Sequence, residues 1–149
     1  MVSLPDLRKF LKKHECFGLD SNILIYFIEG NPHYLDSVKK IFSMIEAGKN
    51  QGVCSTLSLM EILVEPYRKQ NETLVNEFYG LLTTYPNLKW VDLSKEIADL
   101  GAHLRAKYKI KTPDAIILAS AIYSEATGFV CNEKGLQKVK EIEVLILDS

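Results

Sequence analysis

The hydrophobic positions along the chain follow two spacings, one typical of helices and one typical of short strands. In several stretches apolar residues recur every three or four positions, which predicts amphipathic helices. Between these stretches lie short apolar and β-branched runs, which predict buried strands. Helices are expected at residues 3–13, 22–28, 32–47, 55–64, 73–82, 97–108 and 114–123. Strands are expected at residues 16–19, 52–54, 88–91, 128–131 and 144–147.

The order of these elements predicts the fold class. Helices and strands alternate, and strands that are joined through helices run parallel in a sheet covered on both faces. We therefore predict an α/β protein, a three-layer α/β/α sandwich with a mostly parallel central sheet. No internal repeat or linker-like tract divides the chain. Residues 1–149 are expected to form a single domain, with residues 1–14 as an N-terminal helical extension.

Capping residues and prolines indicate where two of the helices begin and end. Ser55 can cap the helix that follows it, and Pro66 is expected to stop that helix. Thr112 and Pro113 suit the N-cap and first position of the last helix. From Asp114 onwards this helix is apolar nearly all round, so it is expected to be buried.

Composition excludes several classes of protein. The chain has 149 residues, of which 47% are hydrophobic and 25% are charged, as in an ordinary folded domain. No apolar run approaches the roughly 18 residues of a membrane span. Charged residues near the N-terminus interrupt the apolar region that a signal peptide needs. The three widely spaced cysteines match neither a disulfide framework nor a zinc motif. We expect a cytoplasmic protein with no membrane partner.

The charge balance restricts how the chain could bind nucleic acid. Its 18 Lys and Arg residues and 19 Asp and Glu residues give a net charge of −1, so any nucleic acid must contact a local basic patch. Such a patch could hold the phosphates beside a scissile bond. A solvated helix end, whose cations complement the helix dipole, would have the same pattern. The candidate residues are Arg105, Lys107, Lys109, Lys111 and Lys134.

Four acidic residues lie at positions from which they could converge. Asp20 directly follows the first predicted strand, and Glu133 lies two residues after the fourth. Asp114 is in the first turn of the last predicted helix, and Glu61 is on the helix after the second strand. The carboxyl ends of parallel strands meet at one edge of the sheet, where sites form. The four carboxylates can therefore lie together at that edge.

Each acid taken alone has a simpler interpretation. Asp20 could be a helix cap, Asp114 could complement a helix dipole, Glu61 could be solvated and Glu133 could be a turn residue. Two carboxylates 4 Å apart, however, repel by about 4 kcal/mol at an effective dielectric of 20. A cluster of four therefore needs cations, and an all-carboxylate set favours Mg²⁺ or Mn²⁺ over zinc. Metal-assisted phosphodiester hydrolysis is the chemistry that such a site suits.

The same segments resemble the motifs of the PIN-domain family, and more closely those of its VapC-type toxin nucleases. They occur in the family's order, and the resemblance extends from about residue 16 to residue 148. Where the family usually has Thr-Asn-Asp in its fourth motif, this chain has Cys131, Asn132 and Glu133. The four segments are GLDSNILIY at 18–26, TLSLME at 56–61, TPDAIILASA at 112–121 and FVCNEKGL at 129–136.

The resemblance implies a function and a role for individual residues. It implies an Mg²⁺- or Mn²⁺-dependent endoribonuclease that cleaves RNA, as the toxin of a type II toxin–antitoxin pair. A cognate antitoxin protein would control this nuclease. Members of the family are commonly dimers, so the resemblance also implies a homodimer. Ser21 and Asn22 would shape the first loop, and Asn132 would brace the site. The catalytic and metal-binding residues would be Asp20, Glu61, Asp114 and Glu133.

Two alternatives belong to other functional classes. One is a PIN-fold RNA-processing or partner-binding module with little or no nuclease activity. The presence of all four acids argues against it, because an inactive site has no physical reason to keep them together. The other is a phosphotransferase of the dehalogenase type, which would need a second acid two residues after Asp20, where this chain has Asn22. Metal-dependent RNA hydrolysis is therefore the function that we predict.

Overall fold

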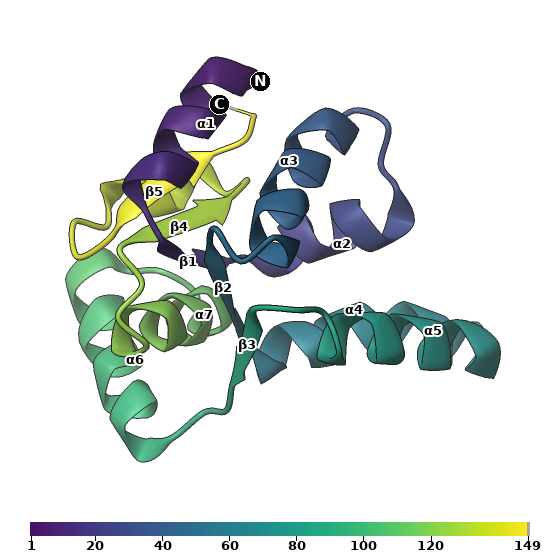
Figure 1. Cartoon of the computed structure of the whole chain (residues 1–149). Helices are drawn as coiled ribbons and strands as arrows, with labels where there is room; N and C mark the ends of the chain where they lie inside the picture. The colour runs from purple at the N-terminus through teal and green to yellow at the C-terminus, as the bar shows by residue number, and fades with distance from the viewer. Residues whose placement is uncertain (149) are drawn as a thin grey trace.

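A parallel sheet of five strands forms the centre of the protein (Figure 1). The structure, a computed structural model, describes residues 1–148. The strands are β1 (Cys16–Leu19), β2 (Gln51–Ser55), β3 (Leu88–Val91), β4 (Gly128–Cys131) and β5 (Glu143–Ile146). They lie side by side in the order β3-β2-β1-β4-β5, and every neighbouring pair is parallel. The sheet therefore reverses its direction of growth at β1, between β2 and β4.

Helices cover both faces of this sheet. They are α1 (Leu4–Lys13), α2 (Ser21–Glu29), α3 (Leu35–Glu46), α4 (Thr56–Arg68), α5 (Glu72–Thr83), α6 (Lys95–Tyr108) and α7 (Thr112–Tyr123), with a 3₁₀ helix, η1 (Lys134–Lys138). Within residues 1–148, no helix combines the length and the apolar character that crossing a membrane requires.

Two hydrophobic clusters hold the helices against the sheet. Successive residues of a strand point to opposite faces, so Val53 belongs to one cluster and Cys54 to the other. The first cluster joins α1, α2 and α3, with parts of α4 and α5, to one face. The second cluster joins α6 and α7 to the opposite face. The predicted α/β/α sandwich with a parallel sheet is thus confirmed.

The packing of α7 on β1 depends on a glycine. A Cβ atom at Gly18 would lie 2.6 Å from the Cβ of Ala121 and 2.7 Å from Cδ1 of Phe129, which is closer than real carbon atoms approach. Only glycine therefore allows this contact without movement. The contact matters for function because α7 carries Asp114 in its first turn and β1 leads directly into Asp20.

The prediction that Pro66 ends its helix is wrong. Helix α4 continues to Arg68 and contains Pro66 in its last turn. Proline removes one N–H donor, and so close to the C-terminal end only the bond to the Ile62 carbonyl is lost. The ring of Pro66 is buried, and the Lys69 N–H donates to the Glu65 carbonyl to close the helix. Burial of the ring offsets the missing bond.

Other differences from the predicted elements are local. Helix α3 begins at Leu35 rather than at residue 32, because residues 31–34 form a turn in which Asn31 Oδ1 accepts the His33 N–H at 3.0 Å. Thr112 is the first residue of α7 and not its cap; Lys111 takes the N-cap position. Strand β5 lies one residue earlier than predicted, and η1 was not predicted.

We predict that Gly18→Ala lowers the free energy of unfolding by about 1–3 kcal/mol, the usual cost of overpacking a core. Gly80→Ala is the matched control, because a Cβ at Gly80 on α5 meets no atom within 4 Å and alanine favours helix by about 1 kcal/mol over glycine. Urea unfolding followed by circular dichroism measures both variants. Equal stability of Gly18→Ala and wild type would contradict the close packing of α7 on β1.

Candidate active site

The carboxyl ends of β1 and β4 form the edge of the sheet at which the candidate residues gather. These strands are neighbours, and the Asp20 N–H donates to the Val130 carbonyl at 3.0 Å. Because the sheet reverses its direction here, this is the place where open α/β sheets leave a crevice for ligands. Asp20 follows β1 and Glu133 follows β4, so both acids lie at that edge.

Asp20 is the most buried of the four acids, with 6% of its surface exposed. It is the N-cap of α2, and its Oδ1 accepts the Ser21 N–H at 2.9 Å. Burial raises the pKa of Asp20 from 3.8 to about 6, against the lowering effect of the Ser21 hydrogen bond. The charges of Asp114, Glu61 and Glu133 raise it further. Asp20 therefore lies in the negative field of the other three acids.

Glu61 reaches the site from α4 through a short chain of hydroxyl groups. The Ser21 Oγ lies 2.7 Å from Glu61 Oε1 and 2.7 Å from the Oγ of the fully buried Ser58. A carboxylate only accepts hydrogen bonds, so Ser21 donates to Glu61 and the Ser58 hydroxyl donates to Ser21. Glu61 itself is exposed. Ser21 thus fixes an exposed carboxylate beside the buried carboxylate of Asp20.

Asp114 joins the same field from the first turn of α7. Its carboxyl is partly buried. Burial raises the pKa of Asp114, the charges of Glu133 and Glu61 raise it as well, and the nearby Lys111 lowers it. Because the charge of Asp114 also acts on Asp20, the structure brings Asp114 within electrostatic reach of the other three acids, as the sequence predicted.

Glu133 and Cys131 complete this edge. The Glu133 side chain is exposed and accepts the Gly135 N–H at 3.1 Å, which caps η1. Glu133 therefore has a local structural contact, and its charge also acts on the other acids. Burial raises the pKa of the Cys131 thiol to about 12, with further contributions from the neighbouring acids. The thiol is protonated at neutral pH and is unsuited to be a thiolate ligand or nucleophile.

The four acids supply oxygen ligands of the kind that hard divalent cations prefer. Among residues 1–148, the hydrogen bond found for the Asp20 carboxylate takes one of about four acceptor positions, and the other ligands at this edge are also carboxylate oxygens. Within residues 1–148, no group of three or more His, Cys, Asp or Glu side chains is close enough together to hold a metal ion. Mutually repelling carboxylates have no reason to converge without a cation. Asp20, Glu61, Asp114 and Glu133 could hold an ion if their side chains turned inward.

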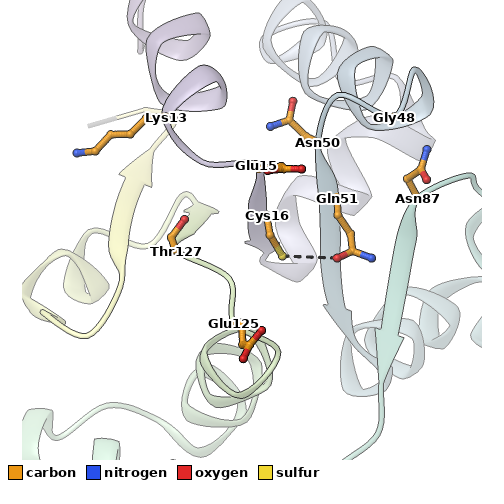
Figure 2. Close-up of a pocket in the computed structure, with 9 residues that line it drawn as sticks. All are labelled: Lys13, Glu15, Cys16, Gly48, Asn50, Gln51, Asn87, Glu125 and Thr127. Carbon is orange, nitrogen blue, oxygen red and sulfur yellow. Dashed lines mark hydrogen bonds between the residues drawn. The ribbon is translucent and has the colours of Figure 1, made fainter.

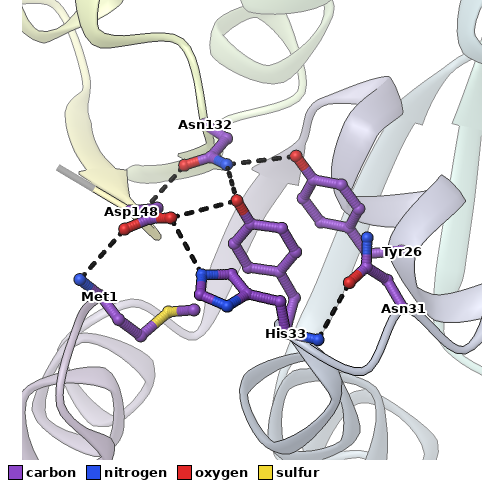
Figure 3. Close-up of polar contacts among 7 residues, drawn as sticks. Met1, Tyr26, Asn31, His33, Asn132 and Asp148 are labelled. Carbon is purple, nitrogen blue, oxygen red and sulfur yellow. Dashed lines mark hydrogen bonds and ion pairs between the residues drawn. The ribbon is translucent and has the colours of Figure 1, made fainter.

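Asn132 links four segments behind this edge (Figure 3). Its Nδ2 donates to the hydroxyls of Tyr26 and Tyr34, at 3.1 and 3.0 Å, and its Oδ1 accepts the Asp148 N–H at 2.8 Å. Asp148 in turn accepts from the Tyr34 hydroxyl and from His33 Nε2, at 3.2 and 3.1 Å. The residue next to Glu133 is therefore tied to α2, to the turn before α3 and to the end of β5.

The contacts of Asn132 with Tyr26, Tyr34 and Asp148 were not predicted from the sequence. Asp148 lies two residues after the last strand, as Glu133 lies two residues after β4, so the strand-end position was the signal that could have found it. The expectation that Ser21 and Asn22 shape a loop is also corrected, because both lie in the first turn of α2. Asn22 is exposed there.

The predicted basic patch does not form a single free surface. Arg105 Nε donates to the Ile110 carbonyl at 2.9 Å, and Lys107 Nζ lies 3.2 Å from Glu141 Oε2. Lys109 takes the left-handed C-cap position of α6. Two of the five residues remain close to the acids, since Lys111 precedes α7 and Lys134 follows Glu133.

A separate cavity of about 410 Å³ lies at the opposite edge of the sheet (Figure 2). Its lining includes Cys16 and Gln51, the first residues of β1 and β2. Cys16 Sγ lies 3.8 Å from Gln51 Oε1 across the cavity wall. None of the four acids lines this cavity, so it is distinct from the candidate site.

Comparisons with known proteins agree with this architecture. A search of the solved structures finds VapBC2 from Rickettsia felis bound to a DNA fragment from their promoter (TM-score 0.71, 19% identity, covering 88% of this chain and 98% of that one). It also finds a toxin–antitoxin complex from Klebsiella pneumoniae (TM-score 0.64, 26% identity, covering 86% of this chain and 94% of that one). A third match is DNA-bound VapBC from Salmonella typhimurium (TM-score 0.63, 18% identity, covering 87% of this chain and 96% of that one). The chain thus shares its fold with chains of these complexes.

The sequence itself matches one family model. No protein of curated function matches the chain significantly. The model of the PIN domain matches residues 18–142, a range that includes all four acids at the carboxyl edge of the sheet. The resemblance predicted from the four sequence segments is confirmed, and the chain belongs to the PIN-domain family.

Proposed function

We propose that the protein is a Mg²⁺- or Mn²⁺-dependent endoribonuclease and the toxin of a type II toxin–antitoxin pair. One observation carries the proposal: Asp20 is buried at the carboxyl edge of the sheet, among three other carboxylates that raise its pKa. Such a concentration of negative charge opposes folding unless a cation balances it. Hydrolysis of phosphodiester bonds is the reaction that carboxylate-bound divalent ions suit.

The four acids would hold the ion, and the neighbouring residues would orient them. When bound, Mg²⁺ or Mn²⁺ would supply positive charge to a phosphate oxygen and lower the pKa of a water molecule. The Ser21 hydroxyl orients Glu61, and the N-cap bond to Ser21 fixes Asp20. Lys111 and Lys134 adjoin the acids and would contact the phosphates of the substrate.

Regulation by an antitoxin is the second part of the proposal. The structural neighbours include toxin–antitoxin complexes. An apolar groove of about 290 Å³ lies between α2, α4 and α5, and Glu61 is part of its lining. A partner segment with apolar side chains in this groove could extend an Arg or Lys to Glu61 and the other acids, where charge-assisted pairing is strong. We propose that the antitoxin blocks the site in this way.

The remaining expectations belong to the same proposal. Residues 1–149 would act as one domain in the cytoplasm, with residues 1–14 as a helical extension, and the protein would be a homodimer. Helix α4 exposes Met60, Val64 and Tyr67 by 59%, 44% and 63%. These residues are spaced to share one face of the helix. An exposed apolar stripe of this kind suits a contact with a second copy.

The central experiment is cleavage of cellular RNA by the purified protein. We expect cleavage with Mg²⁺ or Mn²⁺, loss of cleavage in EDTA, and a loss of about 100-fold or more in Asp20→Asn and Asp114→Asn, since each removes charge from the site. Glu133→Gln should lose less, because Glu133 is exposed and already caps η1. Asp99→Asn on the exposed face of α6 is the control and should cleave normally. Full activity of Asp20→Asn or Asp114→Asn would refute the metal-site assignment and favour the partner-binding alternative.

The raised pKa of Asp20 predicts a pH-dependent stability. Because the folded-state pKa of about 6 exceeds the ordinary 3.8, the folded protein binds the proton more tightly than the unfolded chain does. This stabilisation is complete below about pH 4 and is lost as the pH rises through about 6, by roughly 3 kcal/mol at pH 7.

In EDTA, the unfolding free energy of wild type should therefore fall relative to that of Asp20→Asn between about pH 4 and 7. Mg²⁺ at neutral pH should stabilise wild type and leave Asp20→Asn nearly unchanged, because a ligand stabilises only the state that binds it. Urea titrations of both proteins measure this difference. A constant difference across the pH range would show that Asp20 titrates normally.

Growth of cells that express the chain tests the toxin assignment. We expect expression without a partner to slow growth and Asp20→Asn to relieve the effect, since the variant lacks the buried carboxylate. The level of each protein, measured by immunoblot, is the control. Equal growth with wild type and Asp20→Asn at equal protein levels would contradict the toxin assignment and favour an RNA-processing or binding module.

A further inference from the structure

A basic groove lies between α1 and α3, away from the four acids. It has a volume of about 510 Å³, and four cations line it: Arg8 and Lys12 from α1, Lys40 from α3, and Lys49 from the turn before β2. Glu15 is the only acid in the lining, and the buried Leu11 and the partly buried Met44 supply apolar contacts. The groove is thus strongly positive in a protein whose net charge is −1.

The four cations of this groove form no ion pairs within the described residues. Nearby Lys13, by contrast, pairs with Glu143 at 2.8 Å, and Lys107 of the predicted patch pairs with Glu141. Unpaired cations around a concave surface attract anions more strongly than scattered surface lysines do.

The walls of the groove are held firmly. Leu7, Phe10 and Leu11 bury the apolar face of α1 in the core. Asn50, which lies between α1 and α3 (Figure 2), donates from Nδ2 to the carbonyls of Leu11 and His14, both at 2.8 Å. A basic amphipathic helix can also bind a membrane surface, but that requires a free apolar face. The apolar face of α1 is buried, so its exposed cations suit a hydrophilic polyanion.

The groove lies along the middle and C-terminal parts of α1 and α3 and extends to the turn before β2. Both helices begin at the acidic edge: the Val2 N–H donates to the Leu147 carbonyl at 2.7 Å, after β5, and the Tyr34 hydroxyl lies 3.0 Å from Asn132 Nδ2. With a rise of 1.5 Å per residue, Arg8 and Lys12 lie about 6 and 12 Å along α1 from Leu4. A nucleic-acid strand that runs from the acids along α1 would therefore meet these cations, and the groove would contact phosphates that flank the cleaved bond and not the cleaved phosphate itself.

We propose that the groove between α1 and α3 binds the phosphate backbone of RNA that flanks the cleaved bond. The proposal rests on the proposed ribonuclease function. The acidic edge repels phosphates, so a nearly neutral protein needs separate cations to hold a polyanionic substrate. Helix α1 precedes residues 18–142, which the family model matches, so two of the four cations come from a segment outside the matched range.

A binding experiment with matched variants tests this proposal. The probe is unfractionated tRNA, and all proteins carry Asp20→Asn so that RNA stays intact. Lys12→Gln/Lys40→Gln removes two groove cations, and Lys9→Gln/Lys39→Gln removes two exposed lysines from the same helices that do not line the groove. We expect the groove variant to bind on the order of tenfold more weakly in about 0.1 M salt, with a shallower salt dependence. The control variant should change by less than about twofold.

The outcomes separate this proposal from the proposed function. Equal weakening by both variants, or by neither, overturns the groove as an RNA site. Binding of polyglutamate through the groove cations without binding of tRNA also overturns it, and would indicate an acidic protein partner. Groove-dependent tRNA binding without cleavage by wild type supports the groove and rejects the nuclease. Thermal melts confirm folding, and Arg8→Gln/Lys49→Gln repeats the test at other groove residues.

Cleavage of substrates of different length gives a second readout in the wild-type background. With the groove variant, the KM for tRNA cleavage should rise about tenfold while kcat stays unchanged, since a remote contact affects binding and not the chemical step. Cleavage of a dinucleotide, whose single phosphate is the one that is cleaved and which has no flanking phosphate for the groove, should be the same in the groove variant and wild type. Equal losses with tRNA and dinucleotide would mean that the variant disturbs the acidic site, which overturns the proposal.

Discussion

Electrostatic repulsion among four carboxylates at the carboxyl edge of the sheet is the constraint on which the candidate site depends. Burial removes solvent from the Asp20 carboxylate, and the charges of the other three acids repel it, so both effects disfavour its ionised form. The hydrogen bond from the Ser21 N–H offsets only part of that cost. The sheet and its two hydrophobic clusters must hold these groups together against the repulsion. Close packing of α7 at Gly18 is one means by which they do so.

The fold was predictable because its strands and helices have clear local patterns. Strands β1, β3 and β4 lie at the predicted residues. β1 and β4 are short apolar runs bounded by polar residues, and β3 is a β-favouring run interrupted only by Lys89. The prediction for Pro66 was wrong because local rules disfavour proline in a helix, whereas the burial of its ring depends on how α4 packs in the folded protein. The turn before α3 was missed for a similar reason: its bonds to Asn31 compete with a helical pattern that continues through it.

The site was predictable in its acids and not in the contacts that organise them. A carboxylate after a strand end can be recognised from sequence, because parallel strands end at a common edge. The hydroxyl chain from Ser58 through Ser21 to Glu61 joins residues 37 and 40 positions apart, and Asn132 bonds to tyrosines 106 and 98 positions away. No periodicity relates such residues. Lys107 was predicted to bind RNA from its spacing in the sequence, but in the structure it pairs with Glu141, a contact that the spacing does not show.

Separation of opposite charges explains how a chain with a net charge of −1 could act on a polyanion. The acidic edge needs a cation before a phosphate can approach, so it cannot itself supply the affinity for RNA. Lys111 and Lys134 beside the acids lower the repulsion only locally. The α1–α3 groove lies away from the acids, between two helices that begin at the acidic edge, and four unpaired cations line it. In this arrangement one region would bind the backbone, and the other would be left to hold the metal and carry out the hydrolysis.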